Sequence, residues 1–207
     1  MNAFQRLHEL RMKNTQAGYD MDEKRGRFDA IRMRHGSGTA PRAVSSFQLF
    51  QTPPEIAQRM AAQLYLKRGA RVLEPSAGLG RLLDVLDSEV ETVAVEKSPE
   101  CAAELFRQNR PGMTLKQRDF LTLTVEEIGT FDAVIMNPPF HMRDDIRHIE
   151  HALGFIRPGG TLVALCMDTK HREERLKPIA DRWEPLPCGT FSKEGTGIGV
   201  VLLKITK

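Results

Sequence analysis

The sequence has few cysteines and no long apolar run. Its three cysteines, Cys101, Cys166 and Cys188, stand far apart and form no C-x-x-C pair. This spacing argues against a disulfide framework and against a structural zinc site, so no metal is expected. No apolar stretch reaches the ~18 residues of a membrane span, and the first residues lack the apolar core of a secretory signal. We therefore expect a cytoplasmic protein without membrane contact.

Strong net charge is also missing. The formal charge is only +3 at pH 7 over 207 residues, which is too small to indicate a nucleic-acid partner by itself. Lys and Arg outnumber Asp and Glu before Pro41, and residues 36–41 read as a linker rich in glycine and serine. We predict a basic helical extension over residues 1–45 and one domain over residues 46–207. The extension either contacts phosphates or presents a solvated helix face.

Short apolar strands alternate with helical patterns along the domain. Strands are predicted at residues 71–73, 92–95, 113–117, 131–136 and 161–166, followed by a hairpin of residues 186–191 and 199–205. This order predicts an α/β fold with a doubly wound, mostly parallel, seven-stranded sheet of Rossmann-like type and an antiparallel hairpin at its C-terminus.

The helices have recognisable start signals. Thr52 is predicted as an N-cap, with Pro53 in the first turn and Glu55 closing a capping box. A second helix starts at Ser98 and Pro99. Further helices are expected at residues 82–86, at residues 146–156 before Pro-Gly-Gly at 158–160, and at residues 170–180.

The strand at residues 131–136 runs into Asn137-Pro138-Pro139-Phe140. Two prolines cannot continue a central strand, so the chain leaves the sheet at Asn137. An amide then lies at the carboxyl end of a core strand, where open α/β sheets bind ligands. The alternative is a polar strand terminator followed by a turn.

A second candidate site is the turn Glu74–Gly80 after the first strand. Gly78 and Gly80 allow backbone amides to approach a ligand closely. Glu96 ends the next strand, where a carboxylate can bind ribose hydroxyls, and the residues after Gly80 lack the third glycine of a dinucleotide fingerprint. The ligand should therefore be a nucleoside without a pyrophosphate.

S-adenosylmethionine fits these residues, because its positive charges explain an acidic Glu74. Asp119 and Phe120 follow the third strand at the same edge. The carboxylate can accept a hydrogen bond from adenine, and the phenyl ring either covers the base or packs in the core.

Together these motifs resemble the N6-adenine DNA methyltransferases of the gamma arrangement, in which the cofactor motifs precede the catalytic one. The resemblance covers residues 47–205 and rests on Phe50–Glu55, Glu74–Gly80, Glu96, Asp119-Phe120 and Asn137–Phe140. It implies a class I methyltransferase fold and transfer of a methyl group from S-adenosylmethionine to adenine N6 in DNA. The N-P-P-aromatic motif is shared with guanine-amino and glutamine methyltransferases, so a ribosomal RNA or protein substrate is the rival.

The resemblance also implies roles for individual residues. Asn137 and the Pro138 carbonyl would accept the two hydrogens of the target amine, Pro139 would fix the loop, and Phe140 would stack on a flipped base. Residues implied to contact the cofactor are Thr52, Glu74, Ser76, Ala77, Gly78, Gly80, Glu96, Lys97, Asp119, Phe120 and Asn137.

Substrate contacts are implied for Phe191, as a second aromatic wall or a core residue, and for Arg143, Lys170 and Arg172, as a phosphate rim or solvated helix face. Gamma enzymes usually carry a large target-recognition domain after the catalytic core, and too few residues follow Phe140 for one. We therefore expect a small phage- or plasmid-type enzyme of relaxed specificity, or one served by a specificity subunit or a homodimer. A noncatalytic subunit with this fold is the remaining alternative.

Overall fold

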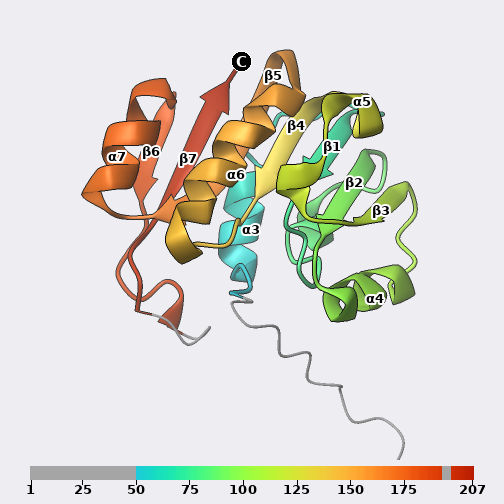
Figure 1. Ribbon diagram of the computed structural model, residues 1–207, viewed down its shortest axis with the longest axis horizontal. Helices are drawn as coiled ribbons and strands as arrows, with labels where there is room; N and C mark the ends of the chain where they lie inside the picture. The colour runs from blue at the N-terminus through green and yellow to red at the C-terminus, as the bar shows by residue number, and fades with distance from the viewer. Residues whose placement is uncertain (1–49, 193–196) are drawn as a thin grey trace, which may run out of the picture. The chain divides into compact units, whose positions relative to one another are not determined.

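A computed structural model describes residues 50–192 and 197–207, so the predicted extension at residues 1–45 lies outside the described residues. The described part is built around one seven-stranded sheet, with β3 and α4 toward one end and β6 and α7 toward the other (Figure 1). The strands are β1 (Arg71–Glu74), β2 (Glu91–Glu96), β3 (Met113–Gln117), β4 (Phe131–Met136), β5 (Ile156–Met167), β6 (Arg182–Pro185) and β7 (Val200–Thr206).

The strand order is β3-β2-β1-β4-β5-β7-β6. The pairs β1–β2, β1–β4, β2–β3 and β4–β5 are parallel, whereas β7 runs antiparallel to both β5 and β6. The predicted Rossmann-like α/β fold is therefore confirmed. Because the first strands are parallel, their carboxyl ends meet at one edge of the sheet.

Helices cover both faces of this sheet. They are α3 (Pro54–Ala61), α4 (Pro99–Arg107), α5 (Val125–Ile128), α6 (Asp144–Ala152) and α7 (Lys170–Leu176). In Figure 1, α6 crosses the face of the sheet that is turned toward the viewer. Within the described ranges, no helix has the length and apolar character that crossing a membrane requires.

Strand β4 shows why the core has two layers. Val134 and Met136 pack in a cluster with Ile149 of α6, whereas Ala133 and Ile135 pack in a cluster with Met60 of α3. Alternate side chains of a strand point to opposite faces, so a strand covered on both sides must be apolar throughout. Burial of each large apolar side chain contributes about 1.5–3 kcal/mol. This anchors the strand that ends at Asn137.

Several predicted boundaries were wrong. Residues 82–86 form only a 3-10 turn, Leu83–Val85. Helix α6 ends at Ala152, and residues 158–160 lie inside the long strand β5. The strand that pairs with β7 on the side away from β5 is Arg182–Pro185, which precedes the predicted residues 186–191. At β5 and β6 the local pattern suited the prediction, but pairing with neighbouring strands set the residues of the strand.

Candidate active site

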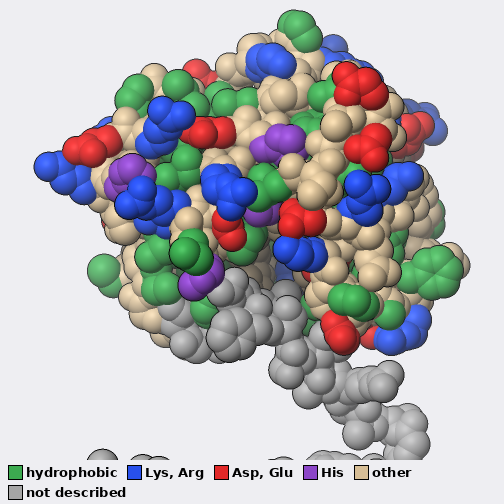
Figure 2. Space-filling view, in the orientation of Figure 1, with side chains coloured by type: hydrophobic (Ala, Val, Ile, Leu, Met, Phe, Trp, Pro, Cys, Tyr) green, Lys and Arg blue, Asp and Glu red, His purple; other side chains and the backbone are tan. Residues whose placement is uncertain are grey.

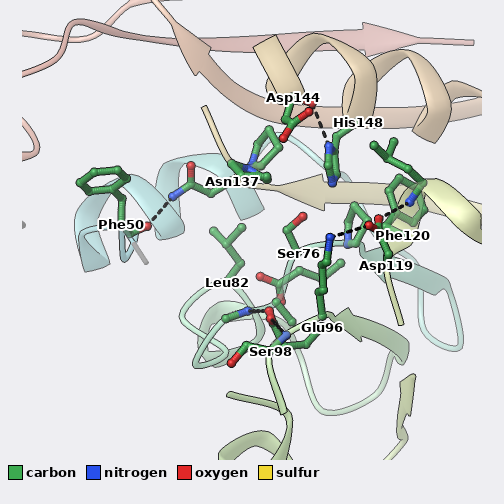
Figure 3. A pocket seen from close by; sticks show the side chains of 18 of the residues that line it. Phe50, Ser76, Leu82, Glu96, Ser98, Asp119, Phe120, Asn137, Asp144 and His148 are labelled. Atoms are coloured by element: carbon green, nitrogen blue, oxygen red, sulfur yellow. Dashed lines mark hydrogen bonds and ion pairs between the residues drawn. The ribbon is translucent and has the colours of Figure 1, made fainter. Parts of the chain in front are cut away.

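A pocket of about 600 Å³ opens at the carboxyl ends of the parallel strands (Figure 3). Most of the predicted site residues line it: Thr52, Glu74, Ser76, Ala77, Gly78, Glu96, Lys97, Asp119, Phe120, Asn137, Pro138, Pro139 and Phe140. They come from the segment before α3 and from the ends of β1, β2, β3 and β4. The strand ends therefore bring the separate motifs into one site.

The turn after β1 is fastened to the end of β2 by Glu96. The backbone N–H of Gly78 donates to Oε2 of Glu96 at 2.7 Å, and the N–H of Ser98 donates to Oε1 at 2.7 Å. Gly78 has φ +54°, in the left-handed region that glycine adopts without strain. The carboxyl group thus shapes the turn, and Glu96 also lines the pocket with lone pairs left to accept further hydrogen bonds.

Glu74 ends β1 as a buried acid, with 2% of its surface exposed. Among the described residues its Oε2 has no hydrogen-bond partner. Burial raises the pKa of this carboxyl well above its usual range, although Arg110 acts in the opposite direction. A buried acid of this kind is suited to a ligand that brings a positive charge to it.

Asp119 and Lys97 face each other at the pocket. Lys97 Nζ donates to Oδ2 of Asp119 at 2.7 Å, and this hydrogen bond lowers the pKa of the aspartate. Asp119 is therefore a carboxylate with acceptor capacity near neutral pH. The neighbouring Phe120 is almost fully buried, with its ring centroid 4.8 Å from His151 and 5.3 Å from Phe155. Its ring belongs mainly to the core.

Asn137 occupies the end of β4, and its carboxamide has a defined orientation. Its Nδ2 donates to the carbonyl of Phe50 at 2.9 Å (Figure 3). It also donates to Oγ1 of Thr52 at 3.1 Å. A carbonyl can only accept a hydrogen bond, so the nitrogen must be the end that faces Phe50. Both amide hydrogens are then engaged, and the oxygen Oδ1 is the end left for a ligand.

The predicted capping role of Thr52 was wrong. Pro53 is the N-cap residue of α3, and Thr52 makes no side-chain bond to the helix. The capping box with Glu55 is therefore absent at this helix start. The Thr52 hydroxyl accepts from Asn137 instead, across 85 residues of sequence.

Arg172 does not lie on an exposed phosphate rim, which corrects the prediction from the sequence. It is buried on α7 and donates from Nε to Oδ2 of Asp145 and from Nη2 to Oδ1, both at 3.1 Å. Its Nη2 also donates to the carbonyl of Phe140 at 3.4 Å. Arg172 thus holds the loop after Asn137, and its guanidinium is engaged by Asp145 and Phe140 in place of an exposed phosphate.

The remaining predicted residues lie outside the pocket. Gly80 faces α4, where an added Cβ would lie 2.9 Å from Cδ2 of Leu105, and Phe191 is buried in the same core cluster as Phe140. Arg143 and Lys170 are exposed and do not line the pocket. Figure 2 shows Lys and Arg interspersed with Asp and Glu on the face of the molecule that it draws. Nζ of Lys170 lies 3.8 Å from Oε1 of Glu174.

Sequence reasoning missed His148 of α6, which lines the pocket. Its Nδ1 donates to the carbonyl of Asp144 at 2.8 Å, and burial lowers its pKa. The neutral ring therefore presents Nε2 as an acceptor (Figure 3). Only its place on the helix after Asn137 could have drawn attention to it, and other polar residues share that helix.

The model of the methyltransferase small domain family matches residues 57–184, which is more than half of the chain. The chain belongs to this family. A sequence search of curated proteins gave no match.

Solved structures of methyltransferases have the same fold. A Listeria monocytogenes protein described as a class I S-adenosylmethionine-dependent methyltransferase has 20% identity and a TM-score of 0.62, covering 84% of this chain and 64% of its own. A type I restriction-modification methyltransferase subunit from Streptococcus thermophilus has 17% identity and a TM-score of 0.65, covering 76% and 44%. An rRNA methylase from the same organism has 15% identity and a TM-score of 0.55, covering 77% and 99%. The chain thus spans less than two thirds of the first two proteins.

The family and fold imply S-adenosylmethionine as the cofactor, and the residues present fit it. The unpartnered oxygen of buried Glu74 suits a positive charge, and Glu96 offers lone pairs to hydroxyl groups. Asp119 and His148 offer acceptors for the amino group of an adenine. Four acceptor groups around one pocket match a cationic nucleoside with several donors.

Proposed function

We propose that this chain transfers a methyl group from S-adenosylmethionine to an amino nitrogen, and that the acceptor is N6 of adenine in DNA. The observation that carries the proposal is the orientation of the Asn137 carboxamide, whose nitrogen is bound by Phe50 and Thr52. An amide oxygen presented to a pocket selects a hydrogen-bond donor, and an amino group is such a donor.

The chemistry requires the protein to act on the acceptor. An exocyclic amine conjugated to a purine is nearly planar, and its lone pair is delocalised into the ring. If Oδ1 of Asn137 and the Pro138 carbonyl accept its two hydrogens, the nitrogen is held with its lone pair out of the ring plane. When bound, S-adenosylmethionine would supply an electrophilic methyl group on its sulfonium. The transfer would form the nitrogen–methyl bond, break the sulfur–methyl bond to leave a neutral thioether, and release one proton from the nitrogen to water.

The loop that carries these acceptors is rigid. Pro138 and Pro139 have fixed φ angles, and the following carbonyl, that of Phe140, is bound by buried Arg172. Phe140 lines the pocket and offers an aromatic ring for stacking. A loop held in this way loses little entropy when it positions a substrate.

DNA is proposed as the substrate because the motifs Thr52-Pro53-Pro54-Glu55 and Asn137–Phe140 occur in the gamma order of the enzymes that the chain resembles. The similarity of fold to a restriction-modification methyltransferase subunit supports the same choice. The similarity to an rRNA methylase keeps RNA as the second candidate.

Transfer of tritium-labelled methyl groups tests the proposal. The full chain is incubated with labelled S-adenosylmethionine and, separately, unmethylated DNA, RNA or a cell protein extract, and the products are hydrolysed and separated. We expect label in N6-methyladenine from DNA. Label confined to RNA or protein would overturn the choice of DNA, and no label in any arm would contradict methyl transfer by the chain alone.

A further inference from the structure

The start of α3 explains why the Thr52 hydroxyl is available for Asn137. Pro53 and Pro54 have no N–H groups, so two of the donors that a helix cap normally satisfies are missing. The Pro53 carbonyl accepts from Ile56 at 3.0 Å and from Ala57 at 2.9 Å. The helix therefore begins without help from Thr52, whose side chain is buried and turned to the end of β4.

The two hydrogen bonds that Asn137 donates have different roles. The Phe50 carbonyl can only accept, so it fixes which end of the carboxamide is nitrogen. The Thr52 hydroxyl accepts the second hydrogen, so rotation of the amide about its last side-chain bond would break two bonds. A carboxamide without such partners has a broad torsional preference at this bond.

Both partners of this contact belong to rigid segments. Thr52 is followed by Pro53-Pro54, and Asn137 is followed by Pro138-Pro139. Each proline fixes its own φ and restricts the residue before it to extended conformations. The hydrogen bond thus joins two stiff Xaa-Pro-Pro segments from opposite parts of the sequence.

We infer that Thr52 is a positioning residue, whose hydroxyl, together with the Phe50 carbonyl, holds the Asn137 carboxamide with Oδ1 toward the substrate amine. This inference rests on the proposed function of Asn137. It differs from the role that the resemblance implied for Thr52, which was contact with the cofactor. The two roles predict different effects of removing the hydroxyl.

Two substitutions at Thr52 distinguish the effect of its hydroxyl from the effect of its side-chain shape. Thr52→Val keeps the branched side chain and removes the acceptor, whereas Thr52→Ser keeps the acceptor. Hydrogen exchange of the Asn137 side-chain amide is measured by NMR magnetisation transfer from water, and the signals are assigned by their loss in Asn137→Ala. We expect exchange to be about fivefold to tenfold faster in Thr52→Val than in wild type, with Thr52→Ser near wild type. Equal exchange in all three proteins would overturn the inference.

Kinetics supply the second readout. In Thr52→Val we expect kcat to fall about tenfold to hundredfold, while the Kd for S-adenosylmethionine by calorimetry stays within about twofold. Thr52→Ser should recover most of the lost kcat. A weakened Kd with unchanged kcat and unchanged exchange would assign the hydroxyl to the cofactor and reject positioning. If wild type transfers no methyl group, the proposed function fails, and the exchange measurement still decides whether Thr52 orients Asn137.

Discussion

The buried ion pair next to the loop that follows Asn137 should contribute strongly to stability. Asp145 has a fully buried side chain, and that of Arg172 is only 10% exposed. Asp145 also accepts from the backbone N–H of Ile146 at 3.0 Å and of Met167 at 3.1 Å. The pair therefore links α7 to the end of β5 and to the start of α6.

Replacing Arg172 by methionine keeps a long side chain but leaves the Asp145 charge buried with backbone donors only. Removal of one partner from a buried pair typically lowers the free energy of unfolding by about 3–5 kcal/mol. We expect a loss of this size for Arg172→Met. Adding Asp145→Asn removes the stranded charge and keeps an acceptor, so the double variant should recover at least about 1 kcal/mol.

Urea unfolding followed by circular dichroism and by the fluorescence of Trp183 measures both effects, since Trp183 is the single tryptophan and lies on β6. The matched control is Arg175→Met on the same helix, because Arg175 is 63% exposed and pairs with Glu150. This control should lose less than about 1 kcal/mol. If Arg172→Met were no more destabilised than Arg175→Met, the assigned role of the buried pair would be refuted.

Two further predictions concern Glu74 and Gly80. Because burial raises the pKa of Glu74, its stabilising contribution is present at low pH and is lost as pH rises through the native pKa. The Tm of Glu74→Gln should therefore rise relative to the Tm of wild type as pH rises. Its affinity for S-adenosylmethionine should fall about tenfold to hundredfold. Parallel curves of Tm against pH for the two proteins would contradict this prediction. In Gly80→Ala the added methyl group would be crowded by Leu105, whereas Gly69 has a positive φ but open space around it. Gly80→Ala should therefore lose about 1–3 kcal/mol more free energy of unfolding than Gly69→Ala. Equal losses in urea unfolding would refute the packing argument.

Much of the fold and of the pocket could be predicted from the sequence. Apolar runs such as residues 131–136 require cover on both faces, and this implies a parallel sheet with helices on each side. The carboxyl ends of parallel strands lie together, so residues that follow separate strands, such as Glu74, Glu96 and Asn137, could be assigned to one pocket from their positions in the sequence.

The rest depended on contacts between residues distant in sequence. The local sequence around Thr52 predicts a helix cap. It cannot reveal that the partner of Thr52 is Asn137, which is 85 positions away. The local sequence around Arg172 predicts a basic helix face. It cannot reveal the ion pair with Asp145, which lies on another helix. Side-chain burial and long-range pairing are set by tertiary packing, and local patterns do not report them.

The central claim is that the Asn137 carboxamide activates an amino group for methylation. The most direct test is the single-turnover rate constant of methyl transfer to adenine in unmethylated DNA by wild type and by Asn137→Ala. Gln117→Ala, which removes an exposed amide outside the pocket, is the control. We predict a loss of at least about a hundredfold for Asn137→Ala, with cofactor Kd within a few-fold and the control unchanged. Transfer by Asn137→Ala at the wild-type rate would contradict the account.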